Sequence, residues 1–232
     1  MTASLGLAVP LYDEAPLVDE VVGAYVDVLR RSETDWRLVL VDNGSRDGTR
    51  AAVDRWAQTD GVEVVYLDEN AGYGGGIQAG LARLREGVAP ELIGWGWGDG
   101  QVDPAVLPAL VAACLHGADL AKVRRVSRHD GWRRRVITRS YAGINRLLGS
   151  RSADVNGCPK VMWRQRFDEI GPQSMDWFLD PELVWQAEAR GWVVAELPAA
   201  MRARRAGQSK VRWTTVLGFS ARLAAWHLRV TP

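Results

Sequence analysis

WRLVLVDNGSRDGT, residues 36–49, contains one complete structural unit of the predicted fold. Residues 36–42 are mostly apolar and predict a buried strand, which ends where Asp42 and Asn43 begin a polar turn. Residues 48–60 then carry apolar side chains at helical spacing. A strand that passes through a polar turn into a helix is half of a βαβ unit, so this stretch predicts a parallel sheet covered by helices.

The same alternation continues on both sides of this stretch. It predicts an α/β fold with a Rossmann-like, mainly parallel sheet flanked by helices and joined by right-handed crossovers. Ligands of such sheets bind beyond the carboxyl ends of the strands, which makes the loops after the strands the candidate site. The further expected strands are 5–10, 62–67, 91–97 and 118–126, and the further expected helices are 15–31, 74–87 and 103–117.

Length and composition are those of one globular domain. The chain has 232 residues, 47% hydrophobic and 25% charged, and we expect a single domain over residues 1–232. Its regular alternation stops after residue 126, which divides it into halves 1–126 and 127–232. A net charge of +1 argues against a nucleic-acid partner, and two cysteines are too few for a structural zinc site. Without a basic leader or a long apolar stretch, the expected location is cytoplasmic.

Two loops of the first half have side chains suited to a nucleotide. Asp42, at a strand end, can accept hydrogen bonds from a base or a ribose, although a simple βα turn with a capping Asp47 explains the loop equally well. DENAGYGGGIQAG (68–80) is dense in glycine and leads into a helix, which suits phosphates or sugar hydroxyls approaching the backbone near Gly74. A flexible turn is the alternative for that loop.

GDGQVDP (98–104) follows the fourth expected strand. Asp103 is the expected N-cap of the next helix, before Pro104. Capping does not explain Asp99 and Gln101, whose side-chain oxygens suit Mg²⁺ or Mn²⁺ bridging a diphosphate.

Four segments together resemble the family 2 glycosyltransferases. They are LAVPLYDEAPLVDEVV, LVLVDNGSRDGT, NAGYGGGIQAGL and GWGDGQVDP, and the similarity extends over roughly residues 5–210. The branch that resembles the chain most is that of the dolichol- or polyprenol-phosphate sugar synthases. The resemblance implies a GT-A fold with a nucleotide-sugar-binding first half and an acceptor-binding second half, and an inverting transfer from a UDP- or GDP-sugar.

The resemblance also implies site residues. Those expected at the nucleotide-sugar are Pro10, Tyr12, Glu14, Asp42, Gly74, Asp99, Gln101, Arg128 and Lys210. Those expected at the acceptor or its phosphate are Arg134, Arg135, Asn156, Lys160 and Arg204. Asp99 is the expected catalytic residue at the diphosphate, and Asp180 or Glu182 would be the general base if the acceptor is a hydroxyl. A lipid phosphate is already anionic and would need no base.

Two residues depart from the family's usual pattern. Trp97 stands where the first Asp of Asp-x-Asp is usual, and Asn43 stands where the second-strand loop usually has a second Asp. Both changes remove a carboxylate, which leaves Mg²⁺ or Mn²⁺ binding by Asp99 and Gln101 an open expectation. Arg and Lys side chains could supply part of the metal's charge instead.

The second half leaves several interpretations open. The basic stretch within 122–135 is either a solvated face or a phosphate-binding segment, and residues 211–230 form either a closing helix or an interfacial helix near a lipid acceptor. The acceptor is thus polyprenyl phosphate or a soluble small molecule of secondary metabolism, with at most peripheral membrane contact. A non-catalytic sugar-nucleotide-binding protein of the same fold is the main alternative. A nucleotidyltransferase is disfavoured, because PLYDE (10–14) has no glycine-rich, basic first loop.

Overall fold

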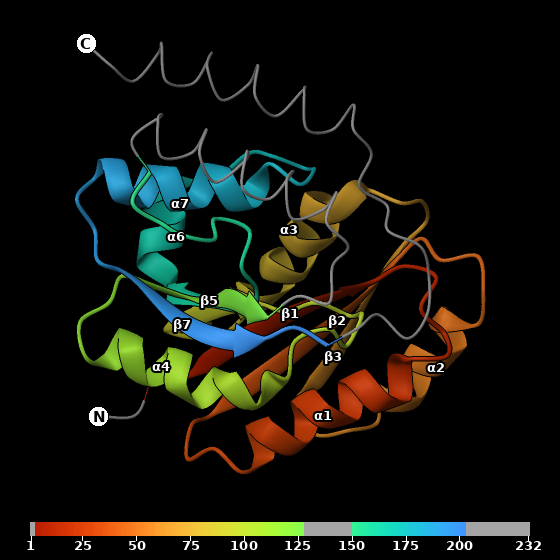
Figure 1. Ribbon diagram of the computed structural model, residues 1–232. Coiled ribbons are helices and arrows are strands. Elements are labelled where there is room, and N and C mark those ends of the chain that lie inside the picture. Colours follow the sequence, from red (N-terminus) through yellow and green to blue (C-terminus); the bar gives the residue numbers. More distant parts are fainter. Residues whose placement is uncertain (1–2, 128–149, 203–232) are drawn as a thin grey trace.

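The computed structural model of the chain describes residues 3–127 and 150–202 (Figure 1). Within these ranges a seven-stranded sheet has the order β3-β2-β1-β4-β6-β5-β7. Its strands are β1 (Leu5–Leu11), β2 (Trp36–Asn43), β3 (Val62–Leu67), β4 (Leu92–Trp95), β5 (Leu120–Ser127), β6 (Lys160–Trp163) and β7 (Val194–Ala200). Only β6 is antiparallel to its neighbours, β4 and β5, so the prediction of a mainly parallel sheet is confirmed.

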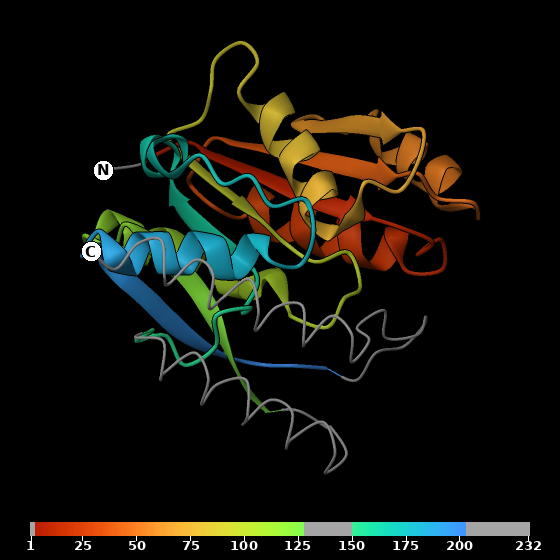
Figure 2. The same cartoon turned by 90° about the horizontal axis from the view of Figure 1, so that it is seen from above.

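Helices cover both faces of the sheet (Figures 1 and 2). One face carries α1 (Val18–Arg30), α2 (Thr49–Trp56), the 3₁₀ turn η1 (Pro104–Val106) and α4 (Leu107–Leu115); the other carries α3 (Gly72–Leu84), α6 (Arg164–Ile170) and α7 (Leu179–Ala189). None of the helices in the described ranges is both long and apolar enough to cross a membrane.

The two hydrophobic cores follow from the alternation of side chains along each strand. In β2, Leu38 and Leu40 pack into the core beneath α1, whereas Val39 and Val41 pack into the core beneath α3. A strand buried on both faces needs apolar residues at every position, and this explains the unbroken apolar runs of the sequence.

The sheet brings the polar loops of the sequence to one edge. Because β6 is antiparallel to both β4 and β5, these two strands point the same way as β1 and β2. The carboxyl ends of β1, β2, β4 and β5 therefore lie at one edge, and β6 begins there with Lys160. This edge is the expected ligand site of such a sheet.

Candidate functional site

The loops that follow β1 and β2 are fastened to each other at this edge. The Arg46 amide donates to Asp13 Oδ1 over 2.8 Å, and the Glu14 amide donates to Thr49 Oγ1 over 2.9 Å. Tyr12, beside them, is half-buried. The first-strand loop expected to hold a base and a ribose is therefore fixed by the second.

Asp42, the last residue but one of β2, has a buried carboxylate of which one oxygen has a hydrogen-bond partner. The residue is 1% exposed, and its Oδ1 accepts a hydrogen bond from the Ser45 amide over 3.2 Å. Its Oδ2 is buried and has no hydrogen-bond partner within the described part of the chain. A buried acceptor without a donor is costly, so this oxygen suits an N–H or O–H group brought by a ligand.

Asn43 is one of the two departures from the family pattern, and its contacts within the protein explain why an amide stands there. Its Oδ1 accepts from the Ala71 amide over 3.0 Å, and its Nδ2 donates to the Gly72 carbonyl over 2.9 Å. Only an amide can both donate and accept in this way; an aspartate could not donate to the carbonyl. Asn43 therefore joins the β2 loop to the glycine-rich loop.

The glycine-rich turn packs closely against a neighbouring segment of the chain. A Cβ at Gly74 would lie 2.5 Å from the Ser174 carbonyl oxygen, and the Gly75 amide donates to the Met175 carbonyl over 2.8 Å. Close approach of the 174–176 segment thus accounts for the glycine at position 74. The sequence had suggested a phosphate or sugar as the reason for it.

The loop after β4 presents Asp99 at the same edge. Asp99 Oδ1 accepts from the Gln101 amide over 3.1 Å, around Gly100, whose φ of 65° favours glycine. Asp103 accepts from the Ala105 amide over 3.0 Å as the N-cap of η1, so that expectation is confirmed.

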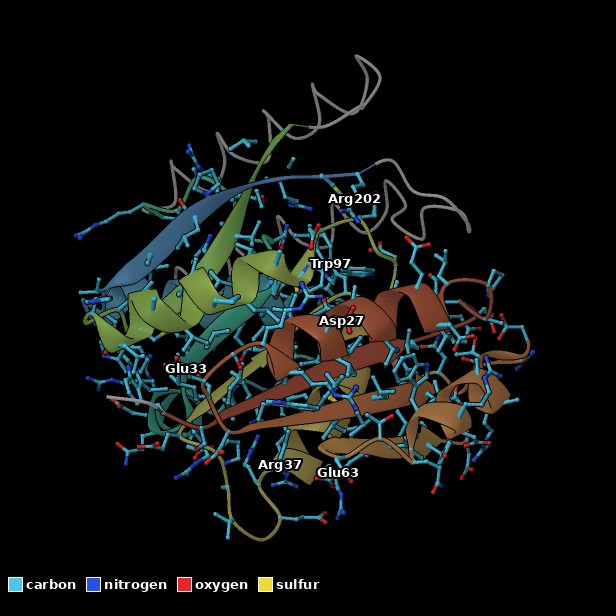
Figure 3. The ribbon with its side chains drawn as sticks, turned by 90° about the horizontal axis from the view of Figure 1, so that it is seen from below. Asp27, Glu33, Arg37, Glu63, Trp97 and Arg202 are labelled. Carbon is cyan, nitrogen blue, oxygen red and sulfur yellow. The ribbon has the colours of Figure 1, made fainter. Side chains whose placement is uncertain are left out.

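Arg202 fastens this loop from the far end of the chain. Its amide donates to the Gln101 carbonyl over 2.7 Å, the Gln101 side-chain amide donates back to the Arg202 carbonyl over 3.3 Å, and its guanidinium pairs with Asp103. Figure 3 shows Arg202 and Trp97 on the same side of the molecule. Sequence reasoning missed this contact, because about a hundred residues separate the partners.

Trp97 begins a run of partly buried polar contacts that we call the indole relay: Trp97, Tyr73, Asp180 and Lys160. Trp97 Nε1 donates to the Tyr73 hydroxyl over 3.1 Å, and this hydroxyl donates to Asp180 Oδ2 over 3.0 Å. Lys160 Nζ lies 2.9 Å from Asp180 Oδ1 and donates to the Gly157 carbonyl. The Lys160–Asp180 contact has the distance of an ion pair but not the angle of a hydrogen bond.

The relay places two expected site residues in the interior. Lys160 is 0% exposed and Asp180 is 1% exposed, so the ammonium expected at the acceptor phosphate faces a protein carboxylate. Burial raises the pKa of Tyr73 well above its usual range, and the nearby Asp180 raises it further, so its hydroxyl stays protonated as a donor. Glu182, the other expected base, accepts the Gln173 and Ser174 amides over 3.0 and 2.9 Å.

Two more partly buried ion pairs flank the relay and were not predicted. Arg125 binds Asp154 through Nε and Nη2, at 2.7 and 2.6 Å, and its guanidinium lies 5.3 Å from the Trp97 ring centre. Lys122 pairs with Glu196. Burial lowers the pKa of Lys122, and Lys160 lowers it further; burial raises the pKa of Glu196, but Lys122 and backbone amides outweigh this and hold it below its usual range.

The remaining predictions concern half-exposed or undescribed positions. Pro10 and Asn156 are half-buried, at the end of β1 and just before β6. Arg128, Arg134, Arg135, Arg204 and Lys210 lie outside the described residues. Residues 3–127 and 150–202 contain no group of three or more His, Cys, Asp or Glu side chains that could hold a metal ion.

Comparison with known proteins adds the family to this geometry. The profile described as "Glycosyl transferase family 2" matches residues 7–171, from within β1 to just past the end of α6. The chain belongs to glycosyl transferase family 2. This glycosyltransferase is 28% identical over 235 residues to polyprenol monophosphomannose synthase of Mycolicibacterium smegmatis, covering 95% of this chain and 86% of that protein. It is 32% identical over 169 residues to dodecaprenyl-phosphate galacturonate synthase of Rhizobium johnstonii, covering 69% of this chain but 47% of that protein.

Solved structures confirm the GT-A fold of this family 2 glycosyltransferase. Glucosyl-3-phosphoglycerate synthase of Mycobacterium tuberculosis, crystallised with Mn²⁺, UDP-glucose and phosphoglyceric acid, superposes with a TM-score of 0.71 at 19% identity, over 98% of this chain and 79% of that chain. The same synthase with Mg²⁺ and UDP gives a TM-score of 0.71 at 20% identity, over 98% and 79%. At this identity the likeness concerns the fold alone.

Proposed function

We propose that this glycosyltransferase moves a sugar from a nucleotide-diphosphate sugar to a polyprenyl phosphate. The observation that supports the donor half is Asp42 at the carboxyl edge of the sheet: its buried Oδ2 has no hydrogen-bond partner among the described residues. A nucleobase N–H would satisfy this oxygen, with Pro10 near the end of the adjacent strand β1 and Tyr12 and Glu14 on the loop that follows it. Asp99 and Gln101 then lie along the same edge, where the diphosphate would follow.

The acceptor half rests on the two candidate bases. A hydroxyl acceptor needs a general base, but Asp180 is buried against Lys160 and Tyr73, and Glu182 holds two backbone amides. A phosphate acceptor is anionic and needs neither. The similarity to two polyprenyl-phosphate sugar synthases points the same way, and so a lipid phosphate fits better than a soluble hydroxyl compound.

The reaction is a displacement at the anomeric carbon. An oxygen of the acceptor phosphate attacks this carbon from the face opposite the nucleotide, and a new C–O bond forms. The bond to the diphosphate oxygen breaks, and its electron pair leaves with the diphosphate. The protein orients the two phosphates and stabilises the leaving charge, for which Arg128 and Lys210 are our candidates.

A divalent cation would have few protein ligands at this site. Trp97 removes one of the usual carboxylates, so Asp99, with Gln101, would hold Mg²⁺ or Mn²⁺ mainly through the diphosphate and water. When bound, the ion would neutralise charge on the leaving diphosphate. We therefore propose that a divalent cation supports donor binding in this chain, and that donor binding depends on the cation less than it would at a site with two carboxylates.

Calorimetric titration tests the donor half of the proposal. UDP- and GDP-sugars are titrated into the full chain, with Mg²⁺, with Mn²⁺ and with a chelator, and we expect one nucleotide series to bind. If no nucleotide binds under any of these conditions, the transferase proposal fails.

Transfer assays test the acceptor half. The bound donor, carrying a labelled sugar, is offered with polyprenyl phosphate in vesicles or with soluble hydroxyl compounds, and label is expected in the lipid fraction. Label in soluble compounds alone would replace the lipid acceptor. Donor binding without transfer to any acceptor would favour a non-catalytic binding protein.

A further inference from the structure

The indole relay holds Trp97, one of the two residues that depart from the family's usual pattern, in place. In the relay the direction of each hydrogen bond is forced, because an indole N–H only donates and a carboxylate only accepts. The single hydroxyl proton of Tyr73 therefore goes to Asp180, and its lone pair receives the proton of Trp97 Nε1. Within the relay, the Tyr73 hydroxyl links the Trp97 indole to the Asp180 carboxylate, because a hydroxyl can both accept and donate.

The backbone and the ring of Trp97 are held as well. The Tyr25 hydroxyl donates to the Trp97 carbonyl over 3.3 Å, and a Cβ at Gly96 would lie 2.1 Å from the same hydroxyl oxygen. Arg125 lies over the Trp97 ring, and Tyr73 itself stacks on Trp177 with ring centres 4.0 Å apart. Trp97 is thus restrained at its carbonyl, at its indole N–H and at the face of its ring.

Asp99 is only two residues from this anchored position. Its loop is fastened on the other side by Arg202, which exchanges two hydrogen bonds with Gln101. The segment from Trp97 to Gln101 is therefore tied at both ends, by the relay at one and by Arg202 at the other. A loop tied in this way can hold its shape before a ligand arrives, which reduces the ordering cost of binding.

We propose that Tyr73, acting through Trp97, is a positioning residue that preforms the diphosphate loop of the donor site. The inference rests on the proposed function, because it takes the donor diphosphate to lie at Asp99. Where the family pattern has a carboxylate, this chain has an indole that is anchored in the protein. The loop then keeps its donor-binding shape in the absence of a divalent cation.

A matched pair of tryptophan substitutions tests this role. Trp97→Phe removes the indole donor and keeps an aromatic ring beneath Arg125. Trp56→Phe is the control, because Trp56 Nε1 also donates to a side-chain oxygen, Asp19 Oδ1 at 2.9 Å, on the α1–α2 surface. In chelator, we expect Trp97→Phe to raise the Kd of the nucleotide about tenfold, as for the loss of one preorganising hydrogen bond, and the control to leave it unchanged.

A double-mutant cycle separates positioning from general stability. Trp97→Phe and Tyr73→Phe both break the Trp97–Tyr73 hydrogen bond, and Tyr73→Phe also removes the bond to Asp180. The double variant should therefore bind nucleotide about as weakly as Tyr73→Phe alone. The donor KM should rise while kcat at saturating donor changes little, an effect that loss of stability alone does not produce. If Trp97→Phe does not fold, Tyr73→Phe, which keeps the indole, carries the same comparison.

Two results would overturn the inference. One is a Trp97→Phe or Tyr73→Phe protein that binds nucleotide in chelator as tightly as the Trp56→Phe control. The other is additive losses in the double variant, which would mean that the two side chains act separately. A wild-type chain that binds no nucleotide at all is a different failure, because it removes the proposed function itself.

Discussion

Replacing Lys160 by methionine should destabilise the folded protein far more than replacing an exposed partner of an ion pair. Lys160 and Asp180 are 0% and 1% exposed, and their charged atoms lie 2.9 Å apart. Lys160→Met would leave the Asp180 carboxylate buried, with the Tyr73 hydroxyl as its remaining partner. Breaking a buried ion pair from one side costs about 3–5 kcal/mol. For a chain of this size, that lowers the Tm by roughly 6–20 °C.

Thermal unfolding followed by circular dichroism measures this difference. Arg55→Met is the matched control, because Arg55 and Asp19 form an ion pair at 2.6 Å with side chains 59% and 61% exposed. An exposed pair contributes about 0–1 kcal/mol, so the control should melt within about 4 °C of the wild type.

A second variant identifies the cause of the lost stability. Lys160→Met combined with Asp180→Leu removes both charges and should recover much of the Tm, although Tyr73 then loses its acceptor. If Lys160→Met melts like the Arg55→Met control but loses transfer to polyprenyl phosphate, our reasoning is refuted. Lys160 would then be the acceptor-phosphate ligand that its place in the sequence suggests.

Three further predictions concern charges at and beside the site. Asp99→Ala should lower kcat/KM about 100-fold or more in the transfer assay, and unchanged activity would show that the diphosphate lies elsewhere. The variant should lower the Tm by no more than about 6 °C, since it removes the hydrogen bond from the Gln101 amide. Trp97→Asp restores the usual carboxylate, so calorimetry should show nucleotide affinity that depends more on Mg²⁺ than in the wild type; equal dependence would remove our explanation of the departure. Glu196→Gln should cost about 1–3 kcal/mol at pH 7 in urea unfolding, since it leaves Lys122 without its carboxylate. Because the pKa of Glu196 is held below its usual range when folded, the stability that it adds is present above pH 4.5 and is lost as the pH falls through the folded value. The difference between wild type and Glu196→Gln should therefore shrink well below pH 4.5, and a constant difference would contradict the ion pair.

The βαβ part of the fold was predictable because its signals are local. Strand β2 is apolar on both faces, and the polar turn after it begins at Asp42, where the strand nears its end. Asp103 indicated the start of the next helix, because aspartate is a common N-cap residue and its side chain accepts a backbone N–H of the first turn. Each of these features depends on neighbours within a few residues, which a single sequence displays.

Strand β6 was not predictable in the same way. It is four residues long and begins with Lys160, a side chain that normally marks a surface or a phosphate site. Its burial depends on Asp180, twenty positions further along the chain, and the sequence alone does not pair the two. Arg125 was overlooked for the same reason, since its partner Asp154 belongs to another part of the chain.

The two departures from the family pattern have a common physical consequence. Asn43 and Trp97 each stand where a carboxylate is usual, and each directs an N–H donor at a protein oxygen, the Gly72 carbonyl and the Tyr73 hydroxyl. Each exchange removes a negative charge from the edge where a diphosphate would bind, and each adds a contact that holds a loop in place. Fewer carboxylates repel a diphosphate less, so less counter-charge is needed to bind it. Loss of metal ligands and retention of donor binding are then compatible, provided that the basic segment after β5 supplies the remaining positive charge. Weak dependence on Mg²⁺ and strong dependence on ionic strength should therefore appear together in the nucleotide affinity of this chain.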